Sequence, residues 1–251
     1  MKRMKATVAY DGTHFEGYQS QPTGRTVQRE IDRALRKLHK DDAIHSVASG
    51  RTDAGVHALG QVIHFDTPLS IPTDRWIVAL NVLLPKDIRI VAVEEVDESF
   101  HARYSATGKT YRYKLSYEPV HSPFERNYSV WLGHLRPNLE RMQEAAQHFI
   151  GTHDFTSYCS SKTGTDNRVR TITQLTIDRK GDELVMDVTG DGFLYNMVRT
   201  IAGMLIAVGR GWNEPEDISK IMLQKDRTKA GKTAPAHGLY LVRVDYENND
   251  N

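Results

Sequence analysis

This chain of 251 residues has a single cysteine, no long apolar run and almost equal numbers of positive and negative charges. With Cys159 as its one cysteine, the sequence excludes an intramolecular disulfide and a cysteine-rich zinc site, as is typical of the reducing cytoplasm. The longest apolar run, residues 201–209, is about half of the roughly 20 residues that a membrane-spanning helix needs. Near the N-terminus, the turn signal Asp11-Gly12 comes before the apolar region of a signal peptide could form. We therefore expect a cytoplasmic protein with no membrane segment.

The net charge of the whole chain does not indicate a polyanionic partner, because its formal value is only +1. Basic side chains nevertheless gather in two segments, residues 167–170 and 225–232. Local basic segments on a nearly neutral protein suit a polyanion that is contacted at chosen points. Taken alone, each segment is equally compatible with an ordinary solvated loop. The candidate contacts are Arg168, Arg170, Lys229 and Lys232.

Apolar periodicity predicts two halves with the same order of elements. In the first half we expect strands at 5–10, 44–49, 60–65 and 88–96, and helices at 26–40 and 73–84, the second capped by Thr73. In the second half we expect strands at 110–117, 170–178, 183–190 and 238–246, and helices at 138–150 and 193–209. The predicted class is α+β, with two ferredoxin-like (RRM-like) halves, residues 1–105 and 106–251, each an antiparallel sheet covered by helices. A cleft between such halves is the expected catalytic site.

Several common chemistries do not fit the sequence. Residues 230–233 end like a P-loop, but Asp226 stands where the first glycine is required and Pro235 argues against the following helix. The histidines show no metal-ligand spacing, so we expect no bound metal. There is no G-x-S-x-G elbow. The turn "TDAG" is similar to that of an aspartic protease, but that chemistry needs two carboxylates that share a proton, and no second "TDAG"-like turn is present. A hydrolase remains a minor alternative.

The side chains that remain are Asp53, Tyr111 and Arg199. Asp53 lies in a Gly-framed turn, "GRTDAG", where an aspartate is usually just a turn former. Tyr111 belongs to an alternating strand, in which a tyrosine usually packs in the core. Arg199 lies on an otherwise apolar helix, so its guanidinium must reach solvent or a partner, because an unpaired buried charge is costly.

Several segments carry distinctive motifs, namely "YDGTHFEGYQSQ", "TVQREIDRAL", "GRTDAGVHALGQVIHF", "FHARYSATGKTYRY", "GTHDFTSYC", "FLYNMVRTIAG" and "TAPAHGLYLVRVDY". Taken together, these motifs resemble those of the tRNA pseudouridine synthase A family. They occur in the family's order and span nearly the whole chain. Tyr18 departs from the family, which often has Trp there, but an aromatic ring is kept.

The resemblance implies an isomerase, usually a homodimer, that converts uridine to pseudouridine in the anticodon stem-loop of tRNA, at positions 38–40, without a cofactor. Asp53 is then the catalytic carboxylate, either a nucleophile at the ribose or base, or a base that removes a ribose proton. Arg199 pairs with that carboxylate, and Tyr111 stacks on the uracil and handles the proton from C5. Arg51 is the candidate for filling the space that the flipped base leaves. For His57 we favour support of the turn over contact with RNA.

Two other functions stay open at this level. The same scaffold suits a tRNA-binding or RNA-chaperone module whose catalysis is incidental or lost. A hydrolase that uses Asp53 and His57 would instead act on small esters or peptides.

Overall fold

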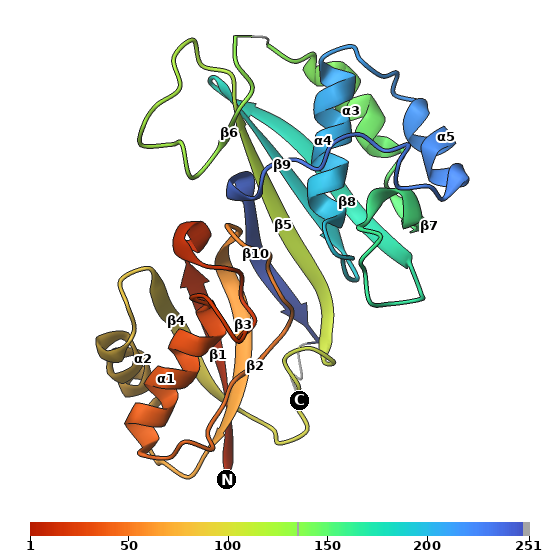
Figure 1. Ribbon diagram of the computed structural model, residues 1–251. Coiled ribbons are helices and arrows are strands. Elements are labelled where there is room, and N and C mark those ends of the chain that lie inside the picture. Colours follow the sequence, from red (N-terminus) through yellow and green to blue (C-terminus); the bar gives the residue numbers. More distant parts are fainter. Residues whose placement is uncertain (135, 248–251) are drawn as a thin grey trace. The chain divides into compact units, whose positions relative to one another are not determined.

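The computed structural model describes residues 1–134 and 136–247, and it divides into two compact units (Figure 1). Unit 1 comprises Met1–Thr107 together with the segment that begins at Tyr240, and unit 2 comprises Gly108–Leu239. Each unit combines helices with a mainly antiparallel sheet, which confirms the predicted α+β class. Within the described residues, no helix has the length and apolar character needed to span a bilayer.

Unit 1 has the strand order of a βαββαβ unit, because β1 pairs antiparallel with both β3 and β4, and β2 pairs with β3. β10 also joins β3, in parallel, through Tyr240 opposite His57 and Leu241 opposite Ala58. From the sequence we expect the strand at 238–246 in the C-terminal half, whereas the structure groups the segment from Tyr240 with unit 1. The elements are β1 (Lys2–Tyr10), α1 (Val27–His39), β2 (Val47–Ala48), β3 (His57–Thr67), α2 (Thr73–Leu83), β4 (Ile88–Val96) and β10 (Leu239–Tyr246).

The core of unit 1 follows from two periodicities. β1 buries every second residue, as alternation requires, and α1 buries Val27, Ile31, Ala34 and Leu35 along one face. The two helices pack against each other and lie over the sheet (Figure 1). Trp76 of α2 is fully buried and meets Phe65 of β3 edge-on, with ring centroids 5.4 Å apart.

Unit 2 is an antiparallel sheet in the order β5-β9-β8-β7, with the short β6 added in parallel to β5. Helix α3 contacts both α4 and β8, and α4 is buried along most of its length. The elements are β5 (Ala106–Ser116), β6 (Val130–Trp131), α3 (Leu139–Gln147), β7 (Gly151–Asp154), β8 (Val169–Lys180), β9 (Glu183–Gly190), α4 (Met197–Gly209) and α5 (Asp217–Gln224).

Some boundaries differ from the expected ones for local reasons. α4 begins at Met197 rather than near residue 193, because Asn196 adopts a left-handed conformation with φ of 61°. The N-cap of α2 is Pro72 rather than Thr73, and no side chain caps this helix by a hydrogen bond. β6, β7 and α5 were not predicted, because such short elements leave little periodicity to read.

Glycine at position 203 lets a loop approach α4 closely. A Cβ at this position would lie 2.0 Å from the carbonyl oxygen of Lys232. Two further contacts hold the same loop, since the Gly231 N–H lies 2.9 Å from the sulfur of Met204 and the Ala234 N–H donates to Arg199 O at 3.0 Å. The basic segment 225–232 is therefore fastened to α4 at its C-terminal end.

We expect Gly203→Ala to lower the free energy of unfolding by about 1–3 kcal/mol, because the added methyl group must displace backbone. Helix propensity alone would raise the stability of this variant by about 1 kcal/mol, so a loss of stability would be due to the clash with the backbone. Urea unfolding measures the effect. Gly164→Ala, where nothing lies within 4 Å, is the matched control and should change stability by less than about 0.5 kcal/mol. A Gly203→Ala protein as stable as the wild type would contradict this close approach.

Candidate functional site

Asp53 lies in the loop that joins β2 to β3 in unit 1, where its side chain is half-buried and that of Arg51 is exposed. The Asp53 carbonyl accepts the N–H of Val56 at 3.1 Å, which closes a tight turn. Gly55 has a φ of 77°, a conformation that glycine adopts without strain. The carboxylate therefore stands at the start of a short turn with a fixed backbone.

A second loop, residues 11–18, supports this turn from one side. The N–H of Tyr18 donates to Thr52 O at 3.0 Å, and the N–H of Gly55 donates to Phe15 O at 3.3 Å. The hydroxyl groups of Tyr10 and Thr52 share a buried hydrogen bond of 2.8 Å. Burial raises the pKa of Tyr10 well above its ordinary value, so this hydroxyl stays protonated at neutral pH.

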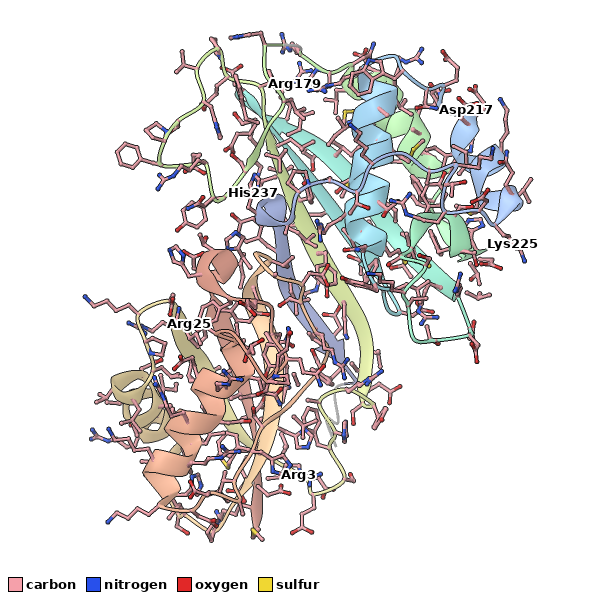
Figure 2. All side chains as sticks on the ribbon, in the orientation of Figure 1. Arg3, Arg25, Arg179, Asp217, Lys225 and His237 are labelled. Carbon is pink, nitrogen blue, oxygen red and sulfur yellow. The ribbon has the colours of Figure 1, made fainter. Side chains whose placement is uncertain are left out.

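The supporting loop is itself anchored by Arg25. Its guanidinium forms two hydrogen bonds with the Asp87 carboxylate, at 2.6 and 2.9 Å, and lies 4.2 Å from the ring centroid of Phe15. Figure 2 labels Arg25 at this end of unit 1. Since Phe15 accepts the Gly55 N–H through its carbonyl, this ion pair holds the residue on which the Asp53 turn rests.

Two glycines make the contact between the loops possible. A Cβ on Gly12 would lie 2.0 Å from Val56 O, and a Cβ on Gly17 would lie 3.0 Å from Thr52 O. Gly17 also has a φ of 97°, which side chains rarely tolerate. The glycines of the segment "YDGTHFEGYQSQ" are therefore explained by the backbone of the Asp53 loop, against which they lie.

From the other side, the loop is held by the buried amide of Gln61 on β3. Its Oε1 accepts from Ser49 Oγ at 2.7 Å, and its Nε2 donates to Gly50 O at 3.0 Å. The sequence analysis singled out neither Gln61 nor Thr52. The available signal was a glutamine inside the apolar strand "GQVIHF", because a buried amide must find partners.

His57, the first residue of β3, is 2% exposed. Its Nδ1 accepts the N–H of Gly12 at 3.0 Å, and its ring stacks on Tyr240 with centroids 4.7 Å apart. The Asp11 carboxylate lies 3.2 Å from the same nitrogen. This burial favours the role of a support for the 11–18 loop over a contact with RNA.

Tyr111 lies on β5 of unit 2, opposite Val188 of β9, with 9% of its surface exposed. Its ring meets Phe193 edge-on, with centroids 5.2 Å apart. The predicted alternation of β5 is confirmed, because Tyr111 and Tyr113 are buried while Arg112 is half-buried and pairs with Asp187 at 2.8 Å. Most of the Tyr111 ring is thus fixed by its surroundings.

Arg199, on α4 of unit 2, has a half-buried side chain that the structure orients. Its Nε donates to Ala234 O at 2.8 Å and its Nη1 donates to Asn196 Oδ1 at 3.0 Å. These acceptors offset the cost of burying the charged guanidinium of Arg199 on an otherwise apolar helix.

The structure brings both basic segments of unit 2 to β7. Arg170 lies opposite His153 in the pairing of β8 with β7, and Lys225, labelled in Figure 2, pairs with Asp154 at 2.8 Å. Lys229 and Lys232 are exposed, whereas Arg168 and Arg170 are half-buried.

Arginines of both basic segments affect the pKa of Cys159. Its thiol is buried, which raises its pKa, while the positive charges of Arg168, Arg227 and Arg170 oppose that rise. Guanidinium groups from both basic segments therefore act on the same place. Among residues 1–134 and 136–247, no three His, Cys, Asp or Glu side chains are arranged to hold a metal ion.

Comparison with known proteins gives consistent matches. The family described as "tRNA pseudouridine synthase" matches residues 6–105 and 145–247. The chain is 54% identical over 246 residues to tRNA pseudouridine synthase A of Lysinibacillus sphaericus (strain C3-41), and 56% identical over 247 residues to that of Bacillus pumilus (strain SAFR-032). Each alignment covers 98% of this chain and 100% of the relative.

Similarity to solved structures is much weaker. The crystal structure of a Cbf5-Nop10-Gar1 complex contains a chain that matches with a TM-score of 0.39 and 11% identity, covering 97% of this chain and 50% of that one. A likeness of this size carries no argument about the site.

We expect Gln61→Met to lower the free energy of unfolding by about 1–3 kcal/mol, because Ser49 and the Gly50 carbonyl lose a buried partner. Amide hydrogen exchange at residues 49–56 should also become faster, and mass spectrometry of the loop peptide measures it. Gln224→Met, at an exposed position at the end of α5, is the control and should leave both quantities unchanged. Unchanged exchange at 49–56 in Gln61→Met would show that Gln61 does not hold this loop.

Proposed function

The chain belongs to the tRNA pseudouridine synthase family, and from that membership we propose that it isomerises uridines at positions 38–40, in the anticodon stem-loop of tRNA, with Asp53 as the single catalytic carboxylate. Enzymes of this family are isomerases that convert uridine in tRNA to pseudouridine. The observation that carries the assignment of Asp53 is the anchoring of its loop from two sides, by the 11–18 loop and by Gln61.

The reaction asks for one well-placed carboxylate rather than a cofactor. The bond from N1 of uracil to C1′ of the ribose breaks, and a bond from C5 to C1′ forms. C5 loses a proton and N1 gains one, so substrate and product have the same composition and no electron is transferred. Asp53 would start this sequence either by adding to the ribose or the base, or by removing a proton from the ribose.

Positioning is the larger part of the task, because the uridine must leave its stack before its glycosidic bond can be reached. The half-buried carboxylate of Asp53 lies on a rigid turn, so it needs little reorganisation when the flipped-out base reaches it. Arg51, exposed two residues before Asp53, would occupy the space that the base vacates.

In unit 2, Tyr111 and Arg199 would bind the substrate. The ring of Tyr111, fixed edge-on by Phe193, would stack on the uracil, and its hydroxyl would take part in moving the C5 proton. The guanidinium of Arg199, oriented by Ala234 O and Asn196 Oδ1, would bind an anionic group of the reacting system.

Phosphate contacts would come from the basic segments at β7, through Arg168, Arg170, Lys229 and Lys232. Such contacts position the RNA without reading its bases. The enzyme would act as a homodimer in the cytoplasm. The homodimer is inferred from the resemblance to the family. The cytoplasmic location is inferred from the tRNA substrate and from the single cysteine.

We expect Asp53→Asn to lose activity by about 10²–10⁴-fold or more while tRNA binding stays within a few-fold. The assay is tritium release from C5-labelled uridine in an unmodified tRNA transcript, with chelator present and no cofactor added. Asp74→Asn, which removes an exposed carboxylate on α2, is the control and should keep full activity. Loss of binding and of folding together in Asp53→Asn would favour the structural turn former. Tight binding by a wild type without tritium release would favour an RNA-binding module.

Reversing the charge of Lys229 and Lys232 to Glu should weaken tRNA binding and reduce the slope of log K against log salt by about 1 for each phosphate contact that is lost. Filter binding over a range of salt concentrations measures both. Lys86→Glu, an exposed lysine of unit 1, is the control. If the double variant binds with the same affinity and slope, the segment is only solvated surface.

A further inference from the structure

The turn at residues 101–105 of unit 1 presents two large side chains to solvent. Tyr104 is 77% exposed and its neighbour Arg103 is also exposed. The ring of Tyr104 rests on that of His101, with centroids 4.3 Å apart and planes inclined by 32°. The guanidinium carbon of Arg103 lies 5.8 Å from the Tyr104 ring centroid. An arginine and a tyrosine thus share one exposed site.

The turn that carries these side chains is unusually well fastened for a surface segment. His101 Nδ1 accepts the N–H groups of both Arg103 and Tyr104, at 3.1 and 3.2 Å. The Ser105 N–H donates to His101 O at 2.9 Å, and the His101 N–H donates back to Ser105 Oγ at 3.0 Å. These bonds leave the backbone little freedom.

The same turn is tied to the sheet through Ala102, which is fully buried. Its N–H donates to His64 Nδ1 at 3.1 Å, and its carbonyl accepts from the hydroxyl of Tyr246 at 2.7 Å. Arg3 adds a bond to the carbonyl of Phe100 at 2.9 Å. Burial lowers the pKa of His64 to about 4, so its ring remains a neutral acceptor under ordinary conditions. The turn is therefore anchored to β1, β3 and β10.

A rigidly held, exposed tyrosine ring is suited to stack on a flat group of a partner. An aromatic ring held in advance loses little conformational entropy on binding, and a nucleobase offers a face of matching size. A base inside a duplex is already stacked on both sides, so the partner must be unpaired. Arg103, which lies beside the ring, is charged and exposed, so the surface next to Tyr104 is not the apolar one that a protein partner would favour.

Arg103 is the cation that lies next to the Tyr104 ring, and one arginine contacts one phosphate. Affinity at this turn would come mainly from stacking on the ring of Tyr104, to which every base can contribute its face.

We propose that residues 101–105 form a stacking platform on which Tyr104 binds one unpaired base of the RNA substrate and Arg103 binds the adjoining phosphate. The proposal rests on the proposed function, since it takes the substrate to be a tRNA, and it adds a contact outside the Asp53 loop. Tyr104 is in this sense a binding residue, and it takes no part in the chemistry.

The test compares variants in binding to an unmodified tRNA transcript and to a fully paired RNA duplex. Tyr104→Ala should weaken tRNA binding by about 5- to 150-fold and leave duplex binding unchanged. Tyr104→Trp should retain binding, because a ring remains. The salt slope should stay the same in Tyr104→Ala and should fall by about 1 in Arg103→Gln.

Two controls make the result specific. Phe124→Ala removes another aromatic ring, 82% exposed, from a loop of unit 2 and should leave both affinities unchanged. Thermal unfolding of Tyr104→Ala should match the wild type, since the ring is exposed and the turn is held by other groups.

The outcomes separate this inference from the function on which it rests. If the wild type releases tritium and Tyr104→Ala binds tRNA with wild-type affinity, the platform is wrong and the proposed function stands. Equal weakening toward duplex RNA would also overturn the platform, because stacking on an unpaired base would not be the cause. If the wild type releases no tritium, the proposed function fails, whatever Tyr104→Ala does to binding.

Discussion

The contact between the backbone of the 11–18 loop and that of the Asp53 loop is the constraint on which the candidate site depends. Two chain segments can approach this closely only where side chains are missing, and Gly12 and Gly17 supply those places. The approach lets main-chain N–H and carbonyl groups of the two loops satisfy each other. A rigid carboxylate is the result, although residues 50–56 form no helix or strand and the 11–18 loop has only the short 3-10 helix Gly12–His14.

Beside the ion pair of Arg25 with Asp87, neutral groups help to hold the loops of unit 1 in place. Tyr10 stays protonated because burial raises its pKa, and His64 stays uncharged because burial lowers its pKa to about 4. Gln61 carries no charge at any pH. Hydrogen bonds of this kind keep the same pattern of donors and acceptors across the neutral range.

Much of the fold was accessible from the sequence because its signals are local. The apolar face of α1, the alternation of β5 and the strand at 88–96 all follow from periodicity, and the turn at Asp53 follows from its glycines. The placement of β10 beside β3 was not accessible, since pairing between strands so far apart in sequence leaves no local trace. The start of α4 at Met197 depends on a left-handed Asn196, which apolar spacing does not reveal.

The site shows the same division. Motif and chemical type predict Asp53, Tyr111 and Arg199 as site residues, whereas Thr52 and Gln61 act through hydrogen bonds that only the folded chain defines. The two basic segments around β7 looked independent in the sequence, because the ion pair of Lys225 with Asp154 joins residues far apart along the chain.

The return of β10 to unit 1 has a consequence for the order in which the protein is made. A chain leaves the ribosome from its N-terminus, and domains generally fold as they emerge. Unit 1, however, lacks the strand that pairs with the start of β3 until residues 240–246 have been synthesised. His57, which lies under the 11–18 loop, acquires its stacking partner Tyr240 only at that moment. The nascent chain therefore carries an incomplete Asp53 region throughout the synthesis of unit 2, and unit 1 is completed only when β10, which follows unit 2, has been translated.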